Sequence, residues 1–325
     1  MKNSHFHQRV GVRLFAALIC GCMGLSSAAQ AQVKLEQKYP PGRSLKHKTK
    51  IRTQQVLTLN GMAIETEAKE TILTAESIGK AGEDSTTPLS IKIEGLKAEI
   101  SLPGGLNVNF DSAEPNAKIE PPQLAFLGEV FRLVSDVNFK IVLDKDNKFK
   151  AVEGTEAIRE KAEKLSEPGK LSVMGRLGPD RLKMNFEQAQ AKIPDILVRL
   201  GDTWERTEVL ELEAGQTLTF RKKYEYLGTE KQGGKTLDKI GVKTTEVKYA
   251  QDPAVPTPLK VADSNLKVDS TSGTILFDRE AGYTTLDSSN TRIKGTIDFT
   301  AGGQKLPGEL DLTFEIESEV QPPAR

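Results

Sequence analysis

The residues that could do chemistry in this chain are few, and their spacing does not assemble a catalytic set. Beyond residue 31 the sequence has one histidine, His47, and no cysteine. That composition excludes Cys–His nucleophiles, zinc-finger spacings and histidine-rich metal sites. His47 could carry a proton or contact a ligand, but no acid or nucleophile can be named beside it. A half-buried structural histidine is therefore the favoured interpretation.

Three short motifs resemble functional ones but lack their companions. Ser77-Ile78-Gly79-Lys80 and Ser264-Asn265-Leu266-Lys267 have the spacing of penicillin-recognising enzymes, without the accompanying Ser-Asp-Asn or Lys-Thr-Gly. Asp144-Lys145-Asp146-Asn147 resembles the start of a calcium loop, but the required later Gly and Glu do not follow. No catalytic residue, metal site or cofactor is predicted. We do not expect an enzyme, and a hydrolase using loop carboxylates is the least favoured alternative.

Trp204 is the only tryptophan and lies in the sequence Gly201-Asp202-Thr203-Trp204. A lone aromatic side chain can stack on a ligand ring. Alternatively, Gly201-Asp202 makes a tight turn and Trp204 covers the end of a sheet. The second interpretation is favoured because tryptophan is so often part of a core.

The first thirty-one residues have the three parts of a secretory signal peptide. A start with three basic residues precedes a mostly apolar run over residues 14–25, which is too short to span a membrane. Ala29-Gln30-Ala31 then supplies the small residues of a cleavage site. We expect cleavage after Ala31 and a periplasmic or secreted protein. A lipoprotein signal cut before Cys22 is the less favoured alternative.

Composition excludes several classes of partner. The leader contains both cysteines, three basic residues and no acidic residue. Without the leader, the chain has 42 basic and 45 acidic residues. Nothing in this balance points to nucleic acid or to a basic membrane-binding face. No later apolar run approaches the length of a membrane span. Abundant Thr, Lys, Glu and Gly suit half-exposed antiparallel strands.

Residues 32–118 are predicted to form a first β meander. Asn60-Gly61 is a two-residue turn signal, so residues 44–78 should be a hairpin in which Leu59 faces Met62 and Leu57 faces Ile64. The odd-numbered residues from Leu45 onward should face inward, and a slip of one residue would reverse the two faces.

Residues 119–200 are predicted to be a helical insert that also contains a β-hairpin. Apolar residues recur at helical spacing behind Pro121-Pro122, again behind Thr155, and a third time behind Pro179-Asp180. Pro168-Gly169 should stop the second of these helices. About three amphipathic helices therefore need an apolar surface to cover, and the nearest is the sheet.

Residues 201–325 are predicted to form a second β meander. Leu310, Leu312, Phe314 and Ile316 alternate with polar residues in its clearest strand. Its start at 215–223 echoes 42–50, and 273–278 echoes 105–111, which suggests an internal duplication with helices inserted between the copies.

The chain resembles a family of exported bacterial proteins of unknown function. The residues that carry the resemblance are Pro41-Gly42-x-x-Leu45 and Arg199-Leu200-Gly201-Asp202-Thr203-Trp204, which leads into the second β-rich half. The resemblance covers nearly all of the chain after the leader and implies no activity. At the fold level, long strands partly covered by helices are similar to periplasmic lipoprotein carriers, which have an unclosed barrel and a helical lid. A fold alone does not fix function.

The sequence therefore predicts a mainly β (α+β) protein with two antiparallel meanders curved around the inserted helices. The leading hypothesis is a non-enzymatic cell-envelope protein that binds a lipid-like or other apolar ligand in a groove between sheet and helices. An ordinary core made of the same residues is equally compatible. The alternative is a structural module that binds another envelope protein through a strand edge. The candidate groove residues are Leu57, Leu59, Phe131, Phe186, Trp204, Phe220 and Tyr224.

Overall fold

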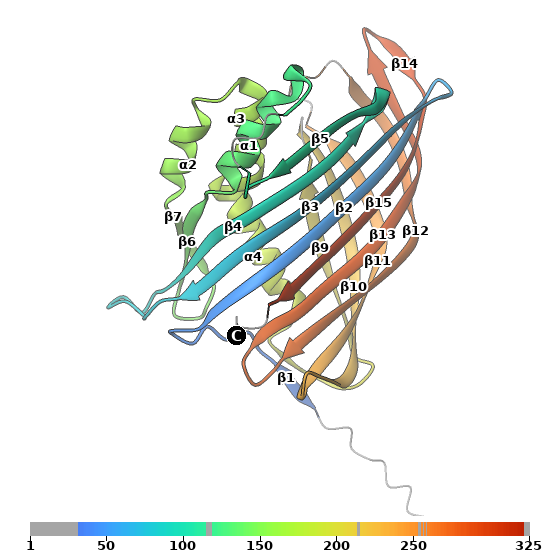
Figure 1. Ribbon diagram of the computed structural model, residues 1–325. Coiled ribbons are helices and arrows are strands. Elements are labelled where there is room, and N and C mark those ends of the chain that lie inside the picture. Colours follow the sequence, from blue (N-terminus) through green and yellow to red (C-terminus); the bar gives the residue numbers. More distant parts are fainter. Residues whose placement is uncertain are drawn as a thin grey trace, which may run out of the picture. The chain divides into compact units, whose positions relative to one another are not determined.

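The computed structural model describes residues 32–114, 119–212, 215–252, 255, 257 and 259–321. Within these residues one antiparallel sheet of thirteen strands dominates, in the order β7-β6-β4-β3-β2-β15-β13-β12-β11-β10-β9, with β5 and β14 paired to β4 and β13 (Figure 1). A separate short pair joins β1 (Val33–Leu35) to β8 (Ile196–Val198). The prediction of a mainly β, antiparallel protein is confirmed. The strands of the large sheet are β2 (Ser44–Leu59), β3 (Met62–Ile78), β4 (Thr87–Leu102), β5 (Leu106–Asp111), β6 (Asn138–Leu143), β7 (Phe149–Glu153), β9 (Thr203–Glu211), β10 (Gln216–Gln232), β11 (Lys235–Gln251), β12 (Lys260–Asp278), β13 (Tyr283–Ala301), β14 (Gln304–Leu306) and β15 (Gly308–Val320).

The first hairpin has the predicted register. Leu59 pairs with Met62 and Leu57 with Ile64, and the pairing continues without a shift to Ser44 and Ser77. Asn60 and Gly61 both have positive φ, 49° and 80°, as a turn of this kind requires. The local chemistry of two residues thus fixes which face every side chain of both strands takes.

The two predicted meanders form one continuous sheet. The last strand, β15, pairs along thirteen residues with β2, from Gly308 against Leu59 to Val320 against His47. Figure 1 shows this as blue β2 lying beside dark red β15. The boundaries at 118 and 200 therefore do not separate two sheets, because β6 and β7 of the middle segment also extend the sheet through β4.

Four α-helices lie between β5 and β8: α1 (Ala125–Val134), α2 (Thr155–Ala162), α3 (Glu167–Leu177) and α4 (Pro179–Lys192). The second predicted helix, α2, ends at Ala162, before Pro168-Gly169 as expected, but these two residues lie in the first turn of a further helix, α3, that was not predicted. The first turn of a helix has no backbone partner for its N–H groups, so proline is tolerated there. The predicted start at Pro179 and end before Pro194 are confirmed for α4.

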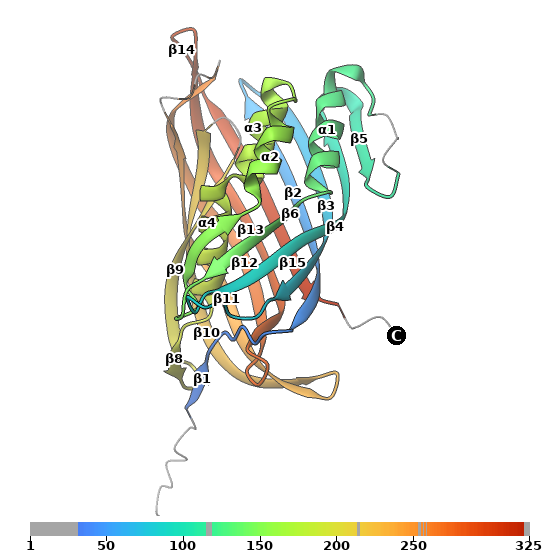
Figure 2. The ribbon, with the colours of Figure 1, turned by 90° about the vertical axis from the view of Figure 1, so that its left-hand side faces the viewer.

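Helix α4 contacts both edge strands of the large sheet, β7 and β9. Gln190 Nε2 donates to the Asn147 carbonyl at 2.6 Å beside β7, and Arg206 Nε of β9 donates to the Ala191 carbonyl at 2.8 Å. Figure 2 shows α4 running alongside β9. The helix therefore bridges the two ends of the strand order.

The buried apolar residues form three separate clusters. The first packs α1, α2 and α3 on strands β3 to β7, for example Phe131 of α1 against Phe110 of β5 with ring centroids 5.4 Å apart. The second joins the β1–β8 pair to β9–β12, and the third occupies the inner face of β10–β15 together with β2.

The internal duplication is not confirmed. The first echoed span contains β2, β3, β4 and β5, whereas the second contains β10, β11 and β12. Gly42 and Gly215 do share positive φ, 86° and 71°, immediately before the long strands β2 and β10. Among the described residues no helix is both long and apolar enough to cross a membrane, and no group of His, Cys, Asp and Glu could hold a metal ion.

Candidate ligand-binding cavity

A cavity of about 210 Å³ lies between α4 and the inner face of the sheet. The helix contributes one face, with residues three or four positions apart that share a side of the helix. The sheet contributes residues of alternating position on β10, β13 and β15, which point to the same face of each strand, and three consecutive residues of the edge strand β9. The lining residues are Arg181, Asn185, Gln188, Ala189, Lys192, Glu208, Val209, Leu210, Phe220, Lys222, Ser289, Thr291, Phe314 and Ile316.

The two walls of this cavity differ in chemistry. The helix side is polar, whereas the sheet side has an apolar floor made by Phe220, Phe314 and Ile316. Phe220 and Phe314 meet edge to face with centroids 6.3 Å apart, a favourable arrangement for two rings. Ile316 lies on the same strand face as Phe314 but remains 39% exposed. The floor is therefore an apolar surface that the chain itself leaves partly uncovered.

A charged network stands at one side of the floor. Glu208 accepts from Lys222 Nζ at 2.7 Å and from the Tyr224 hydroxyl at 2.5 Å. Burial opposes ionisation of Glu208, but Lys192, Lys222 and these two hydrogen bonds outweigh burial and hold its pKa below the ordinary value. Burial and the Glu208 charge raise the pKa of Tyr224. Glu208 is therefore an ionised acceptor held by one hydrogen bond at each carboxylate oxygen.

Lys192 is held in a similar way at the C-terminal end of α4. Its Nζ donates to Asp287 at 2.7 Å. Burial lowers the pKa of Lys192, but Asp287 and Glu208 raise it by more, so the net direction is upward. Both Lys192 and Lys222 are thus committed to carboxylates within the protein.

Arg181 differs from these two lysines. Its side chain is 12% exposed, and its Nη1 lies 3.4 Å from Glu211 Oε2, an ion-pair distance. Nη1 is buried yet makes no hydrogen bond to any described residue. Burial lowers the pKa of Arg181, and Glu211 opposes this. A buried guanidinium nitrogen without a hydrogen bond is costly unless something outside the chain supplies an acceptor.

The seven residues predicted to line a groove are distributed over the three clusters. Phe220 lines the cavity, and Leu57 and Leu59 pack on the cluster that contains it. Phe131 and Phe186 belong to the helix cluster, and Trp204 and Tyr224 to the cluster near β1. Their role in ligand binding stays a prediction for all seven.

Trp204 is tied to the end of α4. Its ring stacks on Tyr224 at 5.7 Å with the planes 8° apart, and its Nε1 donates to the Lys192 carbonyl at 3.1 Å. Gly201 has a φ of 85°, and the Asp202 carboxylate accepts from the Arg199 N–H at 2.8 Å. The turn therefore positions Trp204 over the helix end, with 8% of its surface exposed.

His47 faces inward, as its parity on β2 requires, beside Glu76 and Arg43. His47 Nε2 lies 3.8 Å from Glu76 Oε2, and burial lowers the pKa of His47 in spite of this carboxylate. Arg43 is held between the rings of Tyr39 and Tyr283, with centroids at 5.9 and 5.2 Å. No nucleophile accompanies this cluster among the described residues that contact it.

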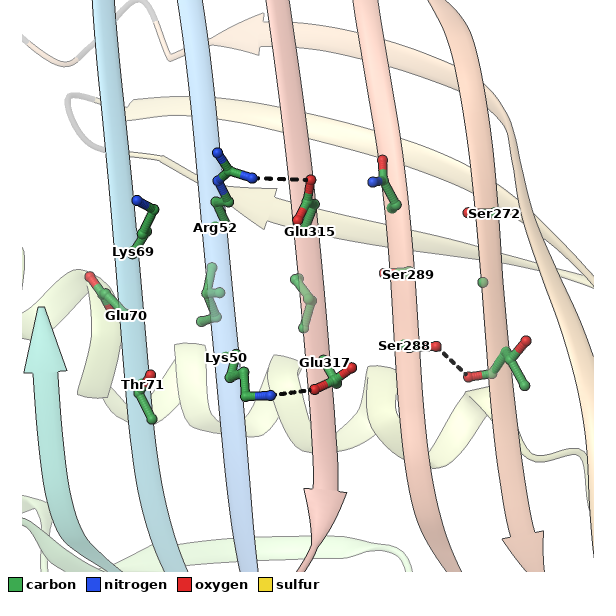
Figure 3. Close-up of a pocket in the computed structure, with 15 residues that line it drawn as sticks. Lys50, Arg52, Lys69, Glu70, Thr71, Ser272, Ser288, Ser289, Glu315 and Glu317 are labelled. Carbon is green, nitrogen blue, oxygen red and sulfur yellow. Dashed lines mark hydrogen bonds and ion pairs between the residues drawn. The ribbon is translucent and has the colours of Figure 1, made fainter. Parts of the chain in front are cut away.

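A second, more open hollow of about 610 Å³ extends over the middle of β3, β2, β15, β13 and β12 (Figure 3). Ion pairs cross its strands, Lys50 with Glu317 at 2.8 Å and Arg52 with Glu315 at 3.9 Å. These side chains are about half exposed, so solvent screens their attraction. The lining has balanced charge and no aromatic ring, which favours no particular ligand.

The fold and the cavity together define the class of this protein. It is a mainly β protein in which one helix bridges the two edges of the sheet and covers a small, partly apolar cavity. The chain belongs to DUF6263, a family of unknown function, whose model matches residues 84–284. The match includes α4 and the β9–β10 side of the cavity but ends before Ser289 and Phe314. No curated protein matches the chain.

Solved structures share only a coarse likeness with the chain. Lipovitellin, in a structure describing lipid–protein interactions, gives a TM-score of 0.41 at 9% identity over 89% of this chain. The chain spans about a quarter of that protein, 26% of its length. The beta domain of the Bordetella autotransporter BrkA gives 0.21 at 8% identity, covering 86% of this chain and 99% of that one. These TM-scores are low, so no function is inferred from them.

Sequence reasoning missed most of the cavity. Arg181, Asn185, Gln188 and Lys192 lie on the polar stripe of α4, which resembles an ordinary solvated face in the sequence. Nothing in the types or spacing of these four residues distinguishes them from such a face. Ser289 and Thr291 carry no sequence signal at all.

Proposed function

We propose that this protein is a non-enzymatic, exported cell-envelope protein that binds a small ligand with an apolar part in the cavity between α4 and the sheet. The observation that carries the proposal is the apolar floor of Phe220, Phe314 and Ile316, partly uncovered at Ile316, beneath a polar helix face. Ligand sites combine an apolar lining with a few placed polar groups in this way.

The size of the cavity limits the ligand. A dry cavity of about 150 Å³ accommodates benzene, so about 210 Å³ accommodates a ring with a short substituent or a short acyl chain. A complete membrane lipid would need part of its chain outside the cavity. The proposed ligand is therefore small, or is one end of a larger amphiphile.

The interaction-module alternative requires a strand edge that is free to accept another chain. At β9 the helix already occupies this position, because Gln188 hydrogen-bonds to both backbone groups of Val209. This local arrangement favours ligand binding over strand addition at that edge.

The experiment that tests the proposal is native mass spectrometry of protein purified from the periplasm, followed by calorimetric titration with hexanoate and 1-hexanol. Ala189→Phe, which fills the cavity, should abolish binding of both compounds. Glu187→Phe, on the exposed side of the same helix, is the matched control and should leave binding unchanged. Absence of binding by the unaltered protein in repeated preparations would overturn the proposal.

Export itself is proposed on the leader sequence. The intact mass of the exported protein should correspond to a chain that begins at Gln32. A mass that includes a lipid on Cys22 would establish the lipoprotein alternative instead.

A further inference from the structure

The cavity contains one cationic group that the protein leaves incompletely satisfied. Lys192 and Lys222 each donate to a carboxylate at 2.7 Å. Arg181 Nη1 has only the 3.4 Å ion-pair contact with Glu211, and it makes no hydrogen bond to the described residues although it is buried. Guanidinium has five N–H donors in a planar fork, which matches the two oxygens of a carboxylate.

Arg181 lies in the first turn of α4, where backbone N–H groups lack intrahelical partners and the helix dipole favours negative charge. Asn185 lies one turn further along on the same wall and can supply an amide donor. Across the cavity, Phe220, Phe314 and Ile316 offer apolar surface, and the only polar groups paired beside Phe314 and Ile316 in the lining are the uncharged hydroxyls of Thr291 and Ser289. Charge and geometry thus place an anion-binding end and an apolar-binding side in one small volume.

We propose that the ligand is a small amphipathic carboxylate, whose carboxylate binds Arg181 beside Asn185 and whose apolar part rests on Phe220, Phe314 and Ile316. This inference rests on the proposed function, because it names the class of ligand that the same cavity takes. Glu211 acts as an internal competitor: its side chain is 47% exposed, so an incoming carboxylate can displace it into solvent.

The test compares hexanoate with 1-hexanol, which have similar apolar chains and differ in charge, by isothermal titration calorimetry at neutral pH. Hexanoate should bind at least about tenfold more tightly, the effect of one charge-assisted hydrogen-bond pair. Arg181→Gln should remove this preference and leave 1-hexanol binding unchanged. Arg221→Gln changes an arginine on the opposite face of β10 and is the matched control.

A second variant protects the test against misfolding of the first. Glu211→Gln removes the competitor without removing a buried group, and should tighten hexanoate binding several-fold while 1-hexanol binding stays the same. Equal binding of both compounds, with no response to either variant, would overturn this inference and leave the cavity function standing. If neither compound binds the unaltered protein, the cavity function fails and this inference fails with it.

Discussion

Gln188 of α4 pairs with Val209 of the edge strand β9 as a neighbouring strand would. Its Nε2 donates to the Val209 carbonyl at 3.2 Å, and its Oε1 accepts from the Val209 N–H. One side-chain amide thus replaces one peptide group of a missing strand. Unpaired edge groups invite association with other chains, so this contact both fixes the helix and protects the edge.

Replacing Gln188 should loosen α4. Gln188→Leu leaves both backbone groups of Val209 without their partner, and the free energy of unfolding should fall by about 1–3 kcal/mol. Urea denaturation measures this, and hydrogen exchange at the Val209 amide should accelerate. Glu187→Leu, an exposed neighbour, is the control. Unchanged exchange at Val209 in the Gln188 variant would contradict the strand-like role of this amide.

Glu208 should make stability depend on pH in the acidic range. Its pKa in the folded protein lies below the ordinary 4.5, so its contribution is complete above that value and is lost as pH falls toward the folded pKa. The free energy of unfolding should therefore decrease as the pH falls below about 5 and through the lowered pKa of Glu208. Glu208→Gln should flatten this decrease without abolishing it, because other carboxylates with lowered pKa remain. An identical slope in both proteins would show that Glu208 does not contribute.

Most of the tyrosines should ionise only at a pH above the range in which free tyrosine ionises. Burial is the largest cause that raises the pKa of Tyr39, Tyr226 and Tyr249, each to about 12, and the pKa of Tyr224 is raised as well. Among five tyrosines in the chain, most of the phenolate absorbance at 295 nm should appear only above about pH 11 or on unfolding. A single titration near pH 10 in the folded protein would contradict the burial of these hydroxyls.

Replacing Gly61 and Gly175 with alanine should change the free energy of unfolding in opposite directions. Gly61 has a φ of 80° with open space around it, so Gly61→Ala carries a conformational cost of about 1 kcal/mol and no clash. Gly175 is an exposed interior residue of α3, also with open space, so Gly175→Ala should stabilise by about 0.5–1 kcal/mol. Thermal unfolding of the two variants measures the difference, and a shared sign would contradict the assigned conformations.

The ion pair between the buried Asp238, near the start of β11, and Arg279, just after β12, should contribute more to stability than the pairs of the open hollow. Asp238 is 1% exposed and accepts from Arg279 and from the Tyr226 hydroxyl at 2.7 Å. Asp238→Ala should destabilise by about 1–3 kcal/mol, because it leaves the buried Tyr226 hydroxyl without its partner, whereas Arg279 is 36% exposed and can be solvated. Lys50→Ala, which removes an exposed pair with Glu317, should have no measurable effect in the same urea assay.

The hairpin of β2 and β3 could be predicted from the sequence because Asn60-Gly61 acts locally. Two residues set the turn, and the turn sets a register that extends to Ser77. The pairing of β15 with β2 could not be predicted, because it joins residues about 250 or more positions apart and no local signal selects one long strand over another as the partner. Helix α3 was missed for a local reason, since proline and glycine can stop a helix or stand in its first turn.

The candidate site was the least predictable part. Phe220 was found because it alternates with polar residues on a strand, which marks an inward position. Its neighbours Arg181 and Ser289 come from a polar helix stripe and from a long Thr/Ser-rich strand, and only the tertiary arrangement brings them together. Trp204 and Tyr224 were predicted to line a groove, and in the structure they stack on each other over the end of α4, outside the cavity lining.

The pairing of β15 with β2 also determines the order in which parts of the sheet can form during folding. As the polypeptide is made, the β2–β3 hairpin emerges early, yet one flank of β2 has no neighbour until the final strand appears. Until then one edge of the sixteen-residue strand β2 is exposed in the nascent chain. Another extended segment could pair with that edge too early, or a chaperone could bind it. Contacts between such distant positions form slowly, and the completion of the sheet should be the late, rate-limiting step of folding.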